Sequence, residues 1–148
     1  YSPRSMIASH PTSAYWVETA DVTTNVTGAS IEEIFKEINL MRDTEPSNEE
    51  LDGIKNYVSG SYIMRHTTPG AILGQLAFLD LHNLDEEWAK NYIAHVVSLE
   101  PSDIQKTAQQ YLDPSVMTIA VVGDGEMIRE EITSFAPIEE ITVESLLP

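Results

Sequence analysis

The sequence contains no cysteine and few basic residues. Without cysteine there is no disulfide framework, no thiol nucleophile and no zinc site with cysteine ligands. Its 8 Lys and Arg stand against 24 Asp and Glu, which gives a formal net charge of −16. So acidic a surface repels the phosphates of nucleic acids and anionic lipid headgroups. We therefore expect neither nucleic acid nor a membrane surface among the partners.

Long hydrophobic runs are also absent. Apolar runs such as residues 119–122 are only a few residues long, against about 18 or more for a membrane span, and no charged-then-apolar leader opens the chain. The 148 residues are 42% hydrophobic, and the 7 Gly and 8 Pro are spread along the chain. This composition predicts one soluble domain with a packed core and argues against disorder.

The first part of the chain predicts a strand followed by a helix. Residues 14–22 are rich in aromatic and β-branched residues that alternate, which is typical of a strand. Residues 1–9 contain Pro3 and read as an edge strand or an extended arm. Ser30 is a good N-cap, and apolar residues follow it with the 3.6-residue period of a helix at 31, 34, 35, 38 and 41.

Five further helices are predicted, four of them from the residues of their first turns. Ser47 and Glu50 form a capping box that begins a helix running to about Met64. Pro69 suits the first turn of the next helix, which ends before Asn83. The following helices begin near Asp85 and at residue 101, and a short helix covers residues 126–134.

Two strands are expected near the end of the chain. Residues 117–122 form a continuous apolar run between two turns and predict a buried strand. Residues 137–148 read as an acidic tail with one strand at 141–143. The order of elements predicts an α+β fold in which helices cover one face of an antiparallel or mixed sheet. Two or three strands are few, because sheets usually hold about four to six.

No self-contained active site is evident from the residues. The four histidines have none of the spacings that place two zinc ligands on one helix, and no Gly-x-Ser-x-Gly elbow is present. Gly123-x-Gly125 is followed by only 23 residues, too few for a dinucleotide-binding unit of about 30 residues. We expect no metal ligand and no catalytic residue in this chain.

Several segments, in order, resemble the C-terminal domain of the pitrilysin/insulinase-type zinc metallopeptidases. Three of them read Tyr-Ser-Pro-Arg-Ser at 1–5, Pro-Ser-Asn-Glu-Glu-Leu at 46–51 and Met-Thr-Ile-Ala-Val-Val-Gly-Asp at 117–124. The others are residues 17–27, 31–38, 74–76 and 101–112. The likeness spans nearly the whole chain, and the bacterial processing-peptidase-like members are the most similar.

This resemblance implies a clam-shell peptidase with two similar α+β halves. The first half of such enzymes carries a His-x-x-Glu-His motif, whose zinc polarises the scissile carbonyl while the glutamate activates water. The present chain matches the second half, so zinc would be held by another domain or subunit. That half supplies an Arg and a Tyr, seven positions apart, that steady the substrate or the oxyanion. Tyr1 matches the tyrosine and is the expected substrate-binding residue, while the arginine would precede residue 1.

The expected organisation is a partial C-terminal metallopeptidase-like domain over residues 1–136, an incomplete half of the enzyme, followed by the acidic tail at 137–148. Its expected role is to enclose peptide substrates, inactive by itself, in the periplasm or cytoplasm of a bacterium. One alternative is a non-catalytic scaffold or partner subunit with the same fold, and another is an acidic interaction domain unrelated to proteolysis. Because a thin sheet leaves unpaired edges, we also expect copies to associate through a strand edge as a homo-oligomer.

Overall fold

The computed structural model describes residues 3–142, which form a mostly helical chain with one two-stranded sheet. The predicted α+β class is confirmed for this part of the chain. In order, the elements are β1 (Arg4–Ser9), β2 (Ala14–Thr19), the 3₁₀ helix η1 (Thr24–Val26), α1 (Thr27–Asp43), α2 (Asn48–Arg65), α3 (Pro69–Leu81), α4 (Glu86–Ser98), α5 (Pro101–Tyr111), the 3₁₀ helix η2 (Pro114–Val116) and α6 (Gly125–Thr133).

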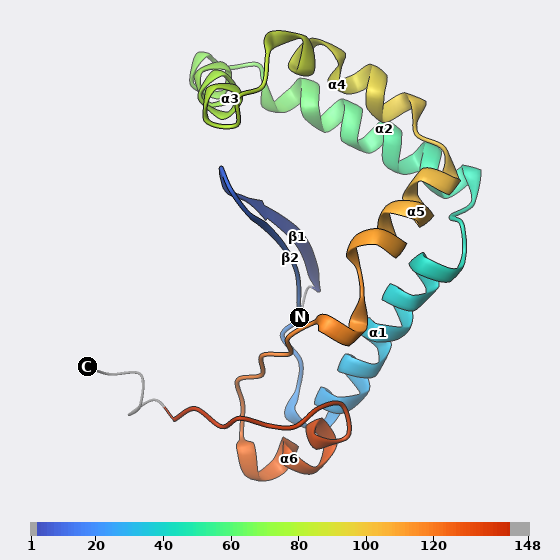
Figure 1. Cartoon of the computed structure of the whole chain (residues 1–148), viewed down its shortest axis with the longest axis vertical. Helices are drawn as coiled ribbons and strands as arrows, with labels where there is room; N and C mark the ends of the chain where they lie inside the picture. The colour runs from blue at the N-terminus through green and yellow to red at the C-terminus, as the bar shows by residue number, and fades with distance from the viewer. Residues whose placement is uncertain (1–2, 143–148) are drawn as a thin grey trace.

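The helices form an open arc around the hairpin (Figure 1). At one end of the arc, α6 packs against α1, and α5 runs along α1. At the other end, α4 packs along α2, and α3 lies beyond them near the tip of the hairpin. The hairpin of β1 and β2 stands inside the arc, so the expected layer of helices over one face of a sheet is replaced by helices that surround it.

The hairpin is antiparallel, and its register places Arg4 opposite Thr19 and Ile7 opposite Trp16. Trp16 donates a hydrogen bond from Nε1 to Ser5 Oγ at 2.7 Å. The second strand ends at Thr19, three residues before the predicted end at residue 22. Pro3 precedes the partner strand and has no amide hydrogen, so the ladder cannot continue with a regular pair beyond Arg4.

Three of the predicted helix starts are confirmed with their caps. Ser47 Oγ accepts from the Glu50 amide at 3.2 Å, and Glu50 Oε2 accepts from the Ser47 amide at 3.1 Å. Thr68 caps α3 with Pro69 in the first turn, and Asp85 Oδ1 accepts from the Trp88 amide at 3.0 Å. The predicted starts at residues 101 and 126 agree with α5 and α6 to within one residue.

The predicted N-cap at Ser30 is wrong, because α1 begins three residues earlier at Thr27. The amide of Gly28 in its first turn donates to Glu131 Oε2 of α6 at 2.9 Å. A carboxylate at a helix N-terminus satisfies a free amide and interacts favourably with the helix dipole. Ser30 Oγ instead donates to Val26 O at 2.7 Å. The start of α1 is therefore stabilised by a tertiary contact rather than by a local cap.

The predicted buried strand at residues 117–122 is also wrong. This segment has no regular secondary structure, and Val122 is fully exposed. Beyond Met117, whose amide donates to Pro114 O, no backbone hydrogen bond joins the segment to another described residue. A strand needs a neighbour to pair with, and none of the described residues pairs with this run. Ile119 and Val121 instead line a cavity of about 130 Å³ between α1 and α6.

The strand expected at 141–143 is not formed by Ile141 and Thr142, while Val143 lies outside the described residues. Within residues 3–142 the sheet has two strands, the lower of the two numbers expected. Both of its faces are open to solvent, since Met6 and Tyr15 on one face are 54% and 56% exposed and Ile7 on the other is 71% exposed.

The buried core is small for a chain of this length. Among the described residues, five apolar side chains are buried, each on a different helix: Ile38, Leu51, Leu79, Ala108 and Ile128. The accessible surface is 11,531 Å², whereas a folded monomer of 16.5 kDa is expected to expose about 7,500 Å². The chain thus exposes about half as much surface again as a closed domain of its mass.

Candidate functional site

Tyr1, the expected substrate-binding residue, lies outside the described residues. The described chain begins at Pro3, next to the start of β1. The described hairpin of β1 and β2 lies inside an arc of helices (Figure 1).

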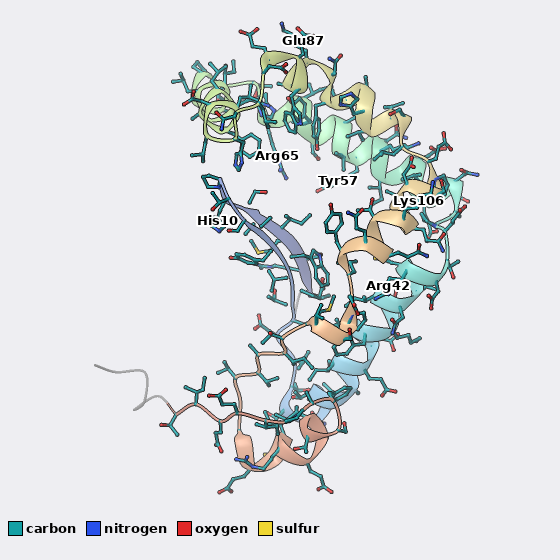
Figure 2. All side chains as sticks on the ribbon, in the orientation of Figure 1. His10, Arg42, Tyr57, Arg65, Glu87 and Lys106 are labelled. Atoms are coloured by element: carbon teal, nitrogen blue, oxygen red, sulfur yellow. The ribbon has the colours of Figure 1, made fainter. Side chains whose placement is uncertain are left out.

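Side chains of α2 project toward the hairpin from across the arc. Figure 2 shows Tyr57 and Arg65 on the side of α2 that faces the hairpin, with His10 near the tip of the hairpin. Tyr57 is 68% exposed. Arg65 forms no ion pair with another described residue, so its guanidinium is available to a carboxylate. The inner side of the arc therefore offers aromatic and cationic groups to a bound chain.

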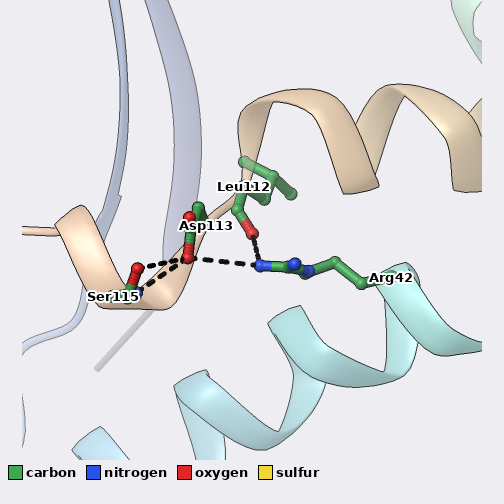
Figure 3. A network of polar contacts seen from close by, with 4 residues as sticks. All are labelled: Arg42, Leu112, Asp113 and Ser115. Atoms are coloured by element: carbon green, nitrogen blue, oxygen red, sulfur yellow. Dashed lines mark hydrogen bonds and ion pairs between the residues drawn. The ribbon is translucent and has the colours of Figure 1, made fainter.

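One polar network joins the end of α1 to the residues that follow α5 (Figure 3). Arg42, in the last turn of α1, donates to Leu112 O at 2.8 Å and lies 3.6 Å from Asp113 Oδ1. The same Asp113 oxygen accepts from the amide and the hydroxyl of Ser115 at 3.0 and 2.8 Å. These Ser115 hydrogen bonds, more than Arg42, hold the pKa of Asp113 below its usual value.

Metal binding finds no support in residues 3–142, where no three His, Asp or Glu side chains come close enough to hold an ion. The histidines contact aromatic rings instead: His10 stacks on Tyr15, and His66 lies 4.4 Å from the Tyr62 ring. The centre of the His82 ring likewise lies 4.4 Å from that of the Phe78 ring. Within the same residues, no helix combines the length and hydrophobicity that crossing a membrane requires.

A hollow with a volume of about 300 Å³ lies between α2, α3 and α4. We call it the α2–α3–α4 groove. Its lining is mainly aliphatic and aromatic, with polar groups at the edges: Tyr62, His66, Ile72, Gln75, Leu76, Leu79, Glu86, Ala89 and Lys90. A volume of this size lies at the lower end of the range for ligand sites, about 300 to 1,000 Å³.

The wall of the groove is held in place by stacked rings and hydrogen bonds. The Tyr62 ring stacks on Tyr92 at 4.3 Å, and Trp88 contacts Tyr92 at 5.5 Å. Tyr62 Oη lies 3.2 Å from Gln75 Oε1 and 3.3 Å from the Ala89 carbonyl oxygen, so its hydroxyl can donate to either. These contacts link the three helices that border the groove.

Sequence patterns did not predict this groove, although they placed three of its lining residues on one predicted helix. Helical periodicity in α3 identified Ile72, Leu76 and Leu79 as one face, but it could not show that this face borders α2 and α4. The missed signal was the composition of α3, whose only charged residue is Asp80. A helix that is apolar on every side is expected to be covered on every side.

Comparisons with protein-family models, with curated proteins and with solved structures return no match for this chain. The likeness to the pitrilysin/insulinase-type peptidases therefore rests on the sequence segments quoted above. An assignment to that family is a proposal drawn from those segments.

Proposed function

We propose that this chain is the substrate-enclosing part of a zinc metalloendopeptidase, with zinc and the catalytic glutamate supplied by another domain or subunit. The segments that resemble the second half of these enzymes support this, because they follow one another in order over nearly the whole chain. On this proposal the chain has no catalytic residue of its own. It closes a chamber over the peptide and shields the reacting bond from bulk solvent, while the water that attacks this bond would be activated in the zinc-bearing half.

The observation that carries the proposal is the excess of exposed surface. About 4,000 Å² more is accessible than a closed monomer of this mass would show, and large apolar side chains on α2 and α3 are part of it. Permanent interfaces bury about 2,000 to 5,000 Å² in total and are richer in apolar residues than transient ones. A chain with this much open apolar surface is suited to be one half of a larger assembly.

The negative charge of the chain favours basic peptides as substrates. With a net charge of −16, the surface attracts cationic groups and repels acidic peptides. Basic peptides would therefore be concentrated in the chamber, and the effect would weaken as salt screens the charges.

The test is reconstitution with a zinc-bearing half that carries His-x-x-Glu-His. We expect this chain alone to leave a quenched fluorescent basic peptide intact, and a mixture of the two halves to cleave it at least tenfold faster than the zinc-bearing half alone. A chelator should abolish the cleavage. An unrelated acidic protein of similar size serves as the control. Complex formation with no rise in cleavage would contradict the proposal and favour the alternative of a non-catalytic scaffold subunit.

Tyr1 gives a second, narrower prediction. If its hydroxyl steadies the substrate or the oxyanion, Tyr1→Phe in the assembled enzyme lowers turnover by about 10²-fold and leaves the zinc content unchanged. Metal analysis and peptide cleavage are measured on the same preparation. Turnover equal to that of the unmodified enzyme would remove the assigned role of Tyr1 without affecting the reconstitution result.

A further inference from the structure

The helix α3 exposes apolar side chains on more than one side. Its sequence, Pro-Gly-Ala-Ile-Leu-Gly-Gln-Leu-Ala-Phe-Leu-Asp-Leu, contains one charged residue, Asp80. Helices of this composition are normally buried all round. In this structure Leu79 is buried, but Ile72, Leu73 and Leu76 are 48%, 66% and 51% exposed.

This exposed apolar surface is continuous with the α2–α3–α4 groove. Ile72 and Leu76 belong to both, since they line the groove and remain about half exposed. Leu73 extends the surface along α3 next to Leu76. The apolar strip is therefore longer than the groove itself, and it fits a row of side chains better than one small molecule.

The edge of the groove is acidic. Glu86 lines it, Glu87 follows in the same helix turn, and Asp80 lies one helical turn from Leu76. Lys90 is the basic residue in the lining, and it is already bound to Glu86 and Glu87 at 3.2 and 2.9 Å. The local charge is negative, so a second copy of this chain, with its own charge of −16, is a poor occupant.

We propose that the α2–α3–α4 groove binds a basic amphipathic helix of a partner protein. Its apolar face lies against Ile72, Leu76 and the Tyr62 ring, and its Lys or Arg side chains lie beside Glu86, Glu87 and Asp80. Docking of an amphipathic helix into an apolar groove is a general mode of recognition, and complementary charge sets its orientation. This site uses none of the residues assigned to substrate, and peptide binding to it is measured separately from peptidase activity.

A tryptophan beside the groove can report binding by its fluorescence. Trp88 contacts Tyr92, which stacks on the groove residue Tyr62, and it lies 5.9 Å from Phe78 of α3. The chain has 2 Trp, so Trp16→Phe leaves Trp88 as the only one. The probe is a synthetic amphipathic helix of leucine and lysine, about 15 residues long, near the minimum for a helix in water. A matched peptide carries glutamate in place of lysine.

We expect the leucine–lysine peptide to shift the Trp88 emission saturably with one peptide bound per chain, and the leucine–glutamate peptide to bind at least tenfold more weakly. Leu76→Glu, and separately Glu86→Gln combined with Glu87→Gln, should each weaken binding at least tenfold. Leu40→Glu on α1 is the matched apolar control, since Leu40 is 52% exposed and far from the groove. Glu32→Gln with Glu37→Gln is the charge control.

Three results would overturn the proposal. One is equal binding of the two peptides, which needs no variant of the protein. Another is a loss of binding in the α1 controls as large as that in the groove variants. The third is a dimer of this chain that Leu76→Glu dissociates and that the lysine peptide does not disrupt, which would make a second copy the occupant.

Discussion

Arg42 joins the ends of two helices that are far apart in the sequence. Its hydrogen bond to Leu112 O and its approach to Asp113 cross from α1 to the chain that follows α5, and Gln109 donates back to Arg42 O at 2.7 Å. Arg42→Met keeps most of the side-chain volume but removes both polar contacts. Because Arg42 is 26% exposed, we expect a loss of about 1 to 2 kcal/mol in the free energy of unfolding.

Urea denaturation followed by circular dichroism measures this loss. Lys106→Met is the control, since Lys106 is 71% exposed and its ion pair with Asp103 spans 4.0 Å on the surface of α5. Its unfolding midpoint should be unchanged. An Arg42 variant with the same midpoint as the wild type would mean that the network in Figure 3 does not hold the helices together.

The ionised carboxylate of Glu50 makes the stability of the start of α2 depend on pH. The Ser47 hydroxyl and then the Ser47 amide donate to its carboxylate, and these bonds lower the pKa of Glu50. A carboxyl group whose pKa is lower in the folded state stabilises the fold above its unfolded pKa, and this contribution is lost as the pH falls through the folded pKa. We therefore expect the stability difference between wild type and Glu50→Gln to be largest near neutral pH and to shrink below about pH 5.

Urea midpoints from pH 7 to pH 3 measure this difference. Glutamine can still accept from Ser47 but does not titrate, so the comparison isolates the charge of Glu50. Glu49→Gln, in the same first turn, controls for the helix dipole. A difference that stays constant with pH would show that the capping box does not depend on the ionised carboxylate.

At the scale of elements, the contact between α1 and α6 depends on a glycine. A Cβ atom at Gly28 would lie 2.9 Å from Glu131 Oε2 and 3.0 Å from Glu131 Cβ. Gly28→Ala therefore forces α6 away from α1 and weakens the hydrogen bond that stabilises the start of α1. We expect a loss of about 1 to 3 kcal/mol in the free energy of unfolding, as for other overpacked sites.

The control for this substitution is Gly60→Ala. Gly60 lies inside α2, and a Cβ atom there would meet no other described residue within 4 Å, so alanine should stabilise α2 by about 0.5 to 1 kcal/mol. Thermal melts of both variants test the pair. A Gly28→Ala protein that is also more stable than the wild type would show that α6 is not held against α1 as described.

An element was predictable from the sequence when the residues that stabilise it lie close together in the sequence. The start of α2 was predictable because Ser47 and Glu50 lie within one turn. The start of α1 was not, since the Gly28 amide binds Glu131, 103 residues away. Residues 117–122 have the composition of a strand, but strand formation requires a paired neighbour. The groove was missed for the same reason, because its three walls meet only through tertiary packing.

At the scale of the whole molecule, two properties oppose each other. Large apolar side chains are exposed along the arc, which favours association, while the net charge of −16 opposes the approach of any second copy. The hairpin is the exception, since β1 and β2 carry only Arg4 and Glu18 as charged residues and are locally neutral. The strand edges are therefore the place where two copies meet with least repulsion.

Both edges of this two-stranded sheet are open within the described residues, and open edges pair with other strands. We expect reversible self-association at tens of micromolar that strengthens as salt screens the remaining charge. Ile7→Lys places a charge on β1, at a side chain that is 71% exposed, and should abolish association without unfolding the chain. Leu76→Glu, at the groove, should leave it unchanged. Sedimentation of the wild type as a clean monomer at low and high salt would contradict this, and dissociation by Leu76→Glu rather than Ile7→Lys would move the contact to α3.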